Sequence, residues 1–254
     1  MLDSKIRGDF LRSGNPSLKK EAFEKFDTLG SGETMTIGGT VNRTFILLLL
    51  LLATFIYSWN QFVTDPGSVL PLILIGAIGG LIVALITIFV PKVSPFTAPL
   101  YALLEGLFLG AVSAQYEAQY GGIVFQAVLL TIAVLFSLLL VYKSGLIKVT
   151  QNFKMGVVAA TGAIFLVYII SFIGGFFGFT VPYLHESSPI GIAISVVIVI
   201  IAALNLVLDF DYIENAAGRS VPKYFEWYGA FGLLITLVWL YLEILRLLSK
   251  LRNR

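Results

Sequence analysis

The sequence has no cysteine and a single histidine, His185, among its 254 residues. Without thiols the chain can form no disulfide, no thiolate metal site and no cysteine nucleophile. One histidine cannot build a histidine-rich metal cluster. Charged residues make up only 13% of the chain, against roughly 25% in an average soluble protein. The composition therefore argues against a soluble globular protein and against thiol chemistry.

Enzyme motifs are also missing. The sequence has no HExxH, no P-loop, no glycine-rich dinucleotide fingerprint and no GxSxG. Ser137 and Ser171 lie in apolar stretches without a nearby histidine, and His185 is expected in an outer loop beside Glu186. Intramembrane aspartyl proteases use two acids, but the flanking motifs that they need are not found. We expect no enzyme, no cofactor and no nucleic-acid partner.

Hydrophobic residues, by contrast, make up 57% of the chain and gather in long runs. Each run is close to the roughly 20 residues that a helix needs to cross a membrane. The runs are continuously apolar rather than alternating, which excludes a β-barrel. We predict an all-α integral membrane protein, a seven-transmembrane-helix bundle in membrane lipid with the last helix central. The predicted spans are Phe45–Val63, Val69–Val90, Thr97–Ala114, Ile123–Tyr142, Met155–Phe177, Ile190–Leu208 and Trp227–Leu248.

Small-residue pairs within the runs predict close helix packing. They are Gly76 with Gly80, Gly106 with Gly110 and Gly174 with Gly178. A chain with seven spans has enough internal contacts to use all of them, so we favour a monomer over a dimer interface.

The basic residues alternate between the loops, as in proteins oriented by positive charge on the cytoplasmic side. Seven precede the first span, and the following loops hold none, one, none, three, none and two. This places the N-terminus in the cytoplasm, with residues 1–43 as a soluble tail, 44–250 as the transmembrane domain and 251–254 as a short basic tail. The four basic residues at the C-terminus break the alternation: Arg246, Lys250, Arg252 and Arg254. Either this cluster comes too late to matter, or the last segment is re-entrant or broken, with Gly229, Gly232 and the Glu243 region as the places to suspect.

Two acids stand out because carboxylates inside a membrane are costly. Asp209 closes the sixth run, four residues after Asn205, so both lie on one helix face. Asp211 points roughly the other way, with Glu214 near it. Asp209 is therefore the acid expected to face the bundle interior, unless it is simply a helix-end acid at the interface.

The second acid, Glu243, lies inside the last run. Arg246 follows three residues later and could neutralise it within the helix. Such a pair would be structural, or a switch if it breaks. Glu105 is a third buried acid, which could join a polar interior or satisfy a backbone group.

Two carboxylates in one dry site cannot both ionise cheaply, so they would titrate as a unit. Such a pair can hold a proton, bind a hard cation or exchange one for the other. Because Ca²⁺ takes roughly 6–8 oxygen ligands, Asp209 and Glu243 alone would form only a weak transit site for this metal. No basic residue lies within the first six runs, so the interior favours cations.

The acidic motifs resemble those of the Bax inhibitor-1 / YccA family. The matching segments are Asp209-Phe-Asp-Tyr-Ile and Leu240-Tyr-Leu-Glu243, while Arg12-Ser-Gly-Asn-Pro and Met35-Thr-Ile-Gly-Gly-Thr-Val-Asn look like its bacterial branch. The resemblance implies seven spans, a cytoplasmic N-terminus and a proton-sensitive Ca²⁺ leak. In the family, two acids bridge and close the pore, and deprotonation separates them. Asp209 matches the first acid and Glu243 the second, which is usually Asp.

The resemblance also has gaps. Some relatives have a pore-side arginine that bonds to an acid, but the second to sixth spans contain no arginine. Relatives restrain a membrane-bound AAA protease, which no residue of this chain indicates.

From these observations we expect a multi-pass protein of the bacterial cytoplasmic (inner) membrane that acts as a pH-sensitive cation leak. Ca²⁺ would be the permeant ion, Asp209 and Glu243 the pH sensor and gate, and Asp211, Glu105 and Asn205 secondary candidates on the ion path. The alternative is a non-transporting regulator that binds a membrane protease or another membrane complex. A proton-coupled secondary transporter is a weaker third reading, because no inverted repeat is visible.

Overall fold

A computed structural model describes residues 33–179, 181, 182, 184 and 186–253. The chain divides into two units, Met1–Thr34 and Met35–Arg254, and everything below concerns the second. The predicted soluble tail lies outside the described residues as far as residue 32.

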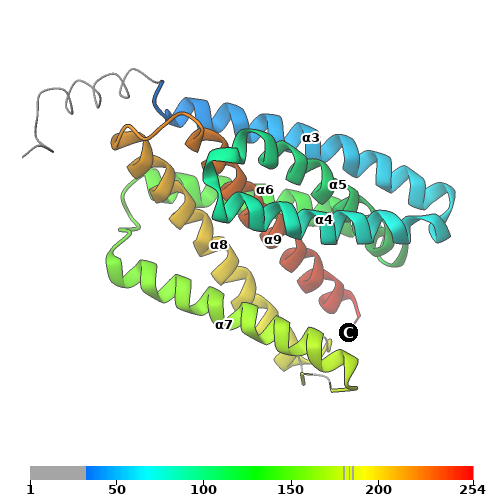
Figure 1. The fold of residues 1–254 in the computed structure, drawn as a ribbon. Coiled ribbons are helices and arrows are strands. Elements are labelled where there is room, and N and C mark those ends of the chain that lie inside the picture. Colours follow the sequence, from blue (N-terminus) through cyan, green and yellow to red (C-terminus); the bar gives the residue numbers. More distant parts are fainter. Residues whose placement is uncertain (1–32, 180, 183, 185, 254) are drawn as a thin grey trace, which may run out of the picture. The chain divides into compact units, whose positions relative to one another are not determined.

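Seven long helices make up the second unit, and the described residues contain no strand (Figure 1). All seven are long and apolar enough to cross a membrane. This confirms the predicted all-α, seven-span architecture. The helices are α3 (Ile37–Thr64), α4 (Leu70–Phe89), α5 (Ser94–Gln119), α6 (Ile123–Lys143), α7 (Gln151–Phe176), α8 (Pro189–Gly218) and α9 (Phe225–Arg252).

Two of these helices extend eight or more residues beyond one end of the predicted span. The first begins at Ile37 rather than Phe45, because Thr36 caps it by accepting a hydrogen bond from the Gly39 amide over 2.9 Å. The sixth continues ten residues past Leu208, to Gly218. Apolar content alone does not mark these ends, because polar residues continue both helices.

The last helix, α9, is the centre of the bundle, as predicted (Figure 1). It packs against α3, α5, α6 and α8, and its apolar segment is the most buried of the seven. Leu234, Leu240 and Leu245 are fully enclosed. Residues on α9 can therefore contact most of the other helices.

The expectation of a broken or re-entrant last segment is wrong, because α9 is one continuous helix of 28 residues. Glu226, in its first turn, bonds to Thr36 at the start of α3. At its other end Arg252 donates to the carbonyls of Tyr120 and Gly121, in the turn after α5. Gly229 and Gly232 lie within this continuous helix and do not break it.

The basic residues at the end of α9 bind protein oxygen atoms. Arg246 pairs with Glu243, and Lys250 donates to three oxygen atoms of the segment around the start of α8. Arg254 lies outside the described residues. The charges that break the alternation therefore have structural partners, which explains how they can end a crossing helix.

Two of the three small-residue pairs pack helices within the chain. A Cβ at Gly106 or Gly110 would overlap the backbone of α3, and one at Gly76 would lie 2.7 Å from the Leu104 carbonyl of α5. Gly174 instead lies against Phe179, just beyond the end of its own helix. The first two pairs account for the tight packing of α3 and α4 on α5.

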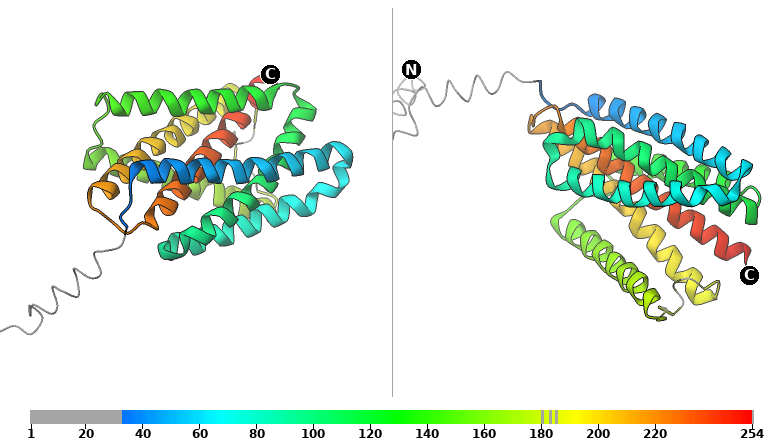
Figure 2. Two further views of the ribbon diagram at one scale, coloured as in Figure 1. Left: turned by 90° about the horizontal axis from the view of Figure 1, so that it is seen from above. Right: turned by 45° about the vertical axis from the view of Figure 1, so that its right-hand side comes forward.

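In contrast, α7 lies along one side of the bundle with α8 between it and most other helices (Figures 1 and 2). Val157 is the one buried residue in α7. This helix is thus the most thinly packed of the seven.

Candidate functional site

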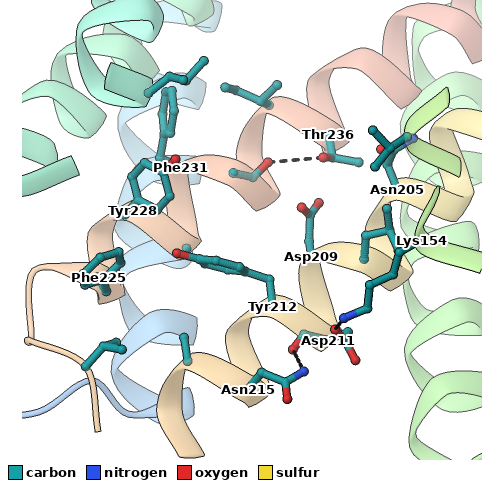
Figure 3. A pocket seen from close by; sticks show the side chains of 18 of the residues that line it. Lys154, Asn205, Asp209, Asp211, Tyr212, Asn215, Phe225, Tyr228, Phe231 and Thr236 are labelled. Carbon is teal, nitrogen blue, oxygen red and sulfur yellow. Dashed lines mark hydrogen bonds and ion pairs between the residues drawn. The ribbon is translucent and has the colours of Figure 1, made fainter. Parts of the chain in front are cut away.

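Asp209 lies in a cavity of about 830 Å³ bounded mainly by α8 and α9 (Figure 3). Its Oδ2 atom is shut off from solvent and has no hydrogen-bond partner among the described residues. Gly232 of α9 faces it, and a Cβ there would lie 4.0 Å from Oδ1. The absence of a side chain at Gly232 keeps the space beside the carboxylate open.

Asn205 lines the same cavity, as its spacing from Asp209 predicts. Its amide donates to Thr161 Oγ1 on α7 over 2.8 Å and to the Ile201 carbonyl of its own helix over 2.8 Å. Thr236 of α9 completes this end of the cavity and donates to the Gly232 carbonyl. This end of the cavity therefore has polar side chains from α8 and α9, and the Asn205 amide is also bonded to α7.

Asp211 lines the cavity as well, nearer the end of α8. It forms an ion pair with Lys154 of α7, which Figure 3 shows reaching across to it. Glu214, one turn further on, is exposed and accepts a hydrogen bond from the Tyr142 hydroxyl of α6. Both acids therefore have a partner on another helix.

Glu243 is 2% exposed and accepts three kinds of hydrogen bond. Arg246 donates at 2.9 Å, which confirms the predicted pair within the helix. The Tyr168 hydroxyl of α7 donates at 2.8 Å and Trp239 Nε1 at 3.1 Å. The sequence could have indicated Trp239 as a partner of Glu243, because it lies four residues earlier on the same helix. Tyr168 is 75 residues away in the chain, so no local spacing indicates it.

The structure does not bring Asp209 and Glu243 together. Asp209 faces Gly232, and Glu243 comes eleven residues later on α9, about 16 Å at a helical rise of about 1.5 Å per residue. The expectation of a single dry site shared by both acids is therefore wrong, and the two acids occupy separate sites. The physical reason is that Arg246 and Tyr168 satisfy Glu243 locally.

Glu105 is buried between α4 and α5, away from the Asp209 cavity. A Cβ at Gly80 would lie 3.2 Å from its Oε2 atom and 3.9 Å from the Tyr101 ring. Tyr101 in turn packs edge-on against Phe231, which lines the cavity. Glu105 thus contacts the residues behind the cavity wall rather than the cavity.

Sequence reasoning missed Glu226, which is 1% exposed in the first turn of α9. It accepts hydrogen bonds from the amide of Thr36 over 3.1 Å and from its hydroxyl over 2.9 Å, and lies 3.5 Å from Arg43 Nη2. The sequence did hold a signal for this residue, because Glu226 directly precedes a predicted span. The partial positive charge at the start of a helix favours an acidic side chain there.

The described residues contain no group of three or more His, Cys, Asp or Glu side chains that could hold a metal ion. Asp209 and Glu243, the predicted transit ligands, belong to no such group among these residues. A cation at either place would need water or backbone oxygen atoms to complete its ligands.

The fold and its enclosed acidic side chains define a multi-pass, seven-helix membrane protein with such side chains on both of its last two helices. The sequence pattern of the Bax inhibitor 1 like family matches residues 15–253, and the chain belongs to this family. No curated protein and no solved structure is significantly similar to the chain.

Proposed function

We propose that this chain is a pH-sensitive cation leak of the bacterial cytoplasmic membrane, with Ca²⁺ as its ion and a cytoplasmic N-terminus. Its place in the bacterial branch of the family is part of this proposal. The observation that carries the proposal is the enclosed, unpartnered Oδ2 of Asp209 in an 830 Å³ cavity.

A carboxylate oxygen that is shut off from solvent without a partner is costly, so we expect a proton or a bound cation to offset its charge. The cavity lining runs from Arg219, just past the end of α8, inward to Asp209 and Thr236. This distance is ten residues of α8, or about 15 Å. The lining therefore offers a route by which a proton or a cation reaches Asp209 from the end of the bundle at which α3 starts.

In this proposal the two acids act in series. Asp209 receives the ion, and the Glu243–Arg246 pair further along α9 is the second barrier. We take the arrangement in which the Glu243–Arg246 pair is intact as the closed state of the proposed leak. Glu105 and Asp211 act on the walls of the path rather than in it.

The test is Ca²⁺ flux into liposomes that contain the purified protein, as pH is stepped from about 6 to about 8, a range that buried carboxyl groups can reach. We expect flux to rise with pH and Asp209→Asn to remove that dependence. Asp65→Asn is the matched control, because Asp65 is an exposed loop residue that caps the helical turn before α4.

Folded protein that gives no flux above empty liposomes at any pH would overturn the proposal. It would favour instead a regulator that binds a membrane complex, such as a membrane-bound AAA protease. That alternative predicts that deletion of residues 1–32 abolishes the cellular effect.

A further inference from the structure

The polar contacts of α7 concentrate on the residues of the two acid sites. Lys154 pairs with Asp211, Thr161 accepts from Asn205, and Tyr168 bonds to Glu243. The same helix buries only Val157. Because α7 has little apolar packing, its hydrogen bonds and ion pair to the candidate site contribute much of what holds it against the bundle.

Tyr168 has the most specific of these contacts. Its hydroxyl donates to Glu243 Oε1 over 2.8 Å and accepts from Arg246 Nη1. The Arg246 guanidinium also lies over the Tyr168 ring, 5.1 Å from its centroid. A phenol has one proton to donate and can accept at the same time, so it fits an intact carboxylate–guanidinium pair.

The other charged or titratable groups near this pair are few among the described residues. Lys250 follows Arg246 by one turn on α9, and Tyr116 of α5 lies on the other side within electrostatic range of Arg246. Lys250 is held by Leu184, Gly191 and Ser195. Tyr168 is thus the titratable group that α7 presents directly to Glu243.

We propose that α7 couples the two acid sites and that Tyr168 is the positioning residue through which the Glu243–Arg246 pair holds α7 in place. This inference rests on the proposed leak function. From Lys154 to Tyr168 is fourteen residues, about 21 Å of helix, enough to span the roughly 16 Å between the sites. When the pair is broken, α7 loses its bond near Glu243 and shifts against the cavity that holds Asp209.

The structure leaves room for such a shift. An apolar groove of about 460 Å³ lies between α7 and α8, lined by Ala163, Ile164 and Val167 beside Tyr168. Apart from Tyr168, the side chains that line the groove are apolar, so they form no hydrogen bonds across it. Movement of α7 there would change the position of Thr161 and Lys154, and with them the partners of Asn205 and Asp211.

The experiment measures α7 directly, by electron spin distance measurements between labels at Phe172→Cys on α7 and Phe125→Cys on α6. Both side chains are exposed, and the chain has no native cysteine, so the labelling is specific. In Tyr168→Phe and in Glu243→Gln we expect a second distance population, raised about tenfold over wild type, the scale of one hydrogen bond to a charged group.

The matched control is Tyr241→Phe. Tyr241 also loses one buried hydroxyl bond, to Ser113 over 2.6 Å, but on the face of α9 that meets α5. It should leave the α7 distances unchanged. An unchanged distribution in both Tyr168→Phe and Glu243→Gln, in folded protein, would overturn the coupling.

A second readout separates coupling from simple loosening. Glu243→Gln should change Ca²⁺ flux in the wild-type background, and this effect should vanish in the Tyr168→Phe background, because the signal has no route to α7. Equal effects in both backgrounds would contradict the inference while leaving the leak intact. Conversely, an α7 shift without any flux would retain the coupling and reject the leak.

Discussion

Gly39 on α3 lies so close to Glu226 on α9 that a Cβ at position 39 would overlap the Glu226 carboxylate. The missing side chain lets the acid reach Thr36, the residue that caps α3. The start of α3 is thereby bound to the start of α9, beside the cavity that contains Asp209. Gly229 continues this contact one turn later, where a Cβ would lie 3.3 Å from Thr40.

Gly39→Ala should therefore destabilise the protein by about 2 kcal/mol, because Glu226 must give up its bonds to Thr36. The measurement is the free energy of unfolding in detergent. Gly38→Ala is the matched control, since a Cβ there meets nothing within 4 Å in the described part of the chain. It should be neutral or slightly stabilising, because alanine favours helix. Equal effects of the two substitutions would contradict the contact.

Gly110→Ala should be more damaging, because its Cβ would collide with the Phe55 carbonyl of α3, a backbone atom that cannot rotate away. We expect a loss of about 3 kcal/mol in the free energy of unfolding. Gly162→Ala on the thinly packed α7 serves as control, since its Cβ would enter open space among the described residues. If Gly110→Ala and Gly162→Ala have the same free energy of unfolding, α3 does not pack on α5 as closely as described.

The seven spans could be predicted because each depends on local apolar content and on the positions of charges. The Asn205–Asp209 face was predictable for the same reason, since spacing of four residues decides it. Arg246 was found as the partner of Glu243 three residues away. These features need no knowledge of tertiary packing.

The rest depends on contacts between distant segments. Tyr168 and Glu226 acquire their partners across 75 and 190 residues, and no local pattern announces either contact. The sequence also did not predict the separation of Asp209 from Glu243. A family resemblance indicates which acids matter, but it does not show that α7 provides a hydrogen-bond partner for Glu243. Likewise, Lys250 looked like a topological charge until its buried partners were visible.

Lys250→Met should loosen the segment before α8. Lys250 is 4% exposed and donates to the carbonyls of Leu184 and Gly191 and to Ser195 Oγ, at 2.8–3.1 Å. Methionine fills similar space but donates nothing, so we expect a loss of about 2 kcal/mol. Hydrogen exchange of Gly191 and its neighbours should accelerate. Lys143→Met, at an exposed position, should change neither quantity.

Arg246→Met should leave the enclosed carboxylate of Glu243 without its cation, and breaking a buried ion pair in this way costs about 3–5 kcal/mol. The exposure of Arg246, at 31% of its side chain, places the expected loss at the lower end, about 3 kcal/mol. Glu243→Gln alone should cost less, because the cation that it leaves without a partner, Arg246, is partly exposed and can be hydrated. The double substitution should then cost clearly less than the sum of the two single losses, since it leaves neither charge buried without its partner. Free energies of unfolding for the four proteins measure this coupling directly. Strict additivity would mean that the two charges do not stabilise each other, and the Glu243–Arg246 pair could then not serve as the second barrier.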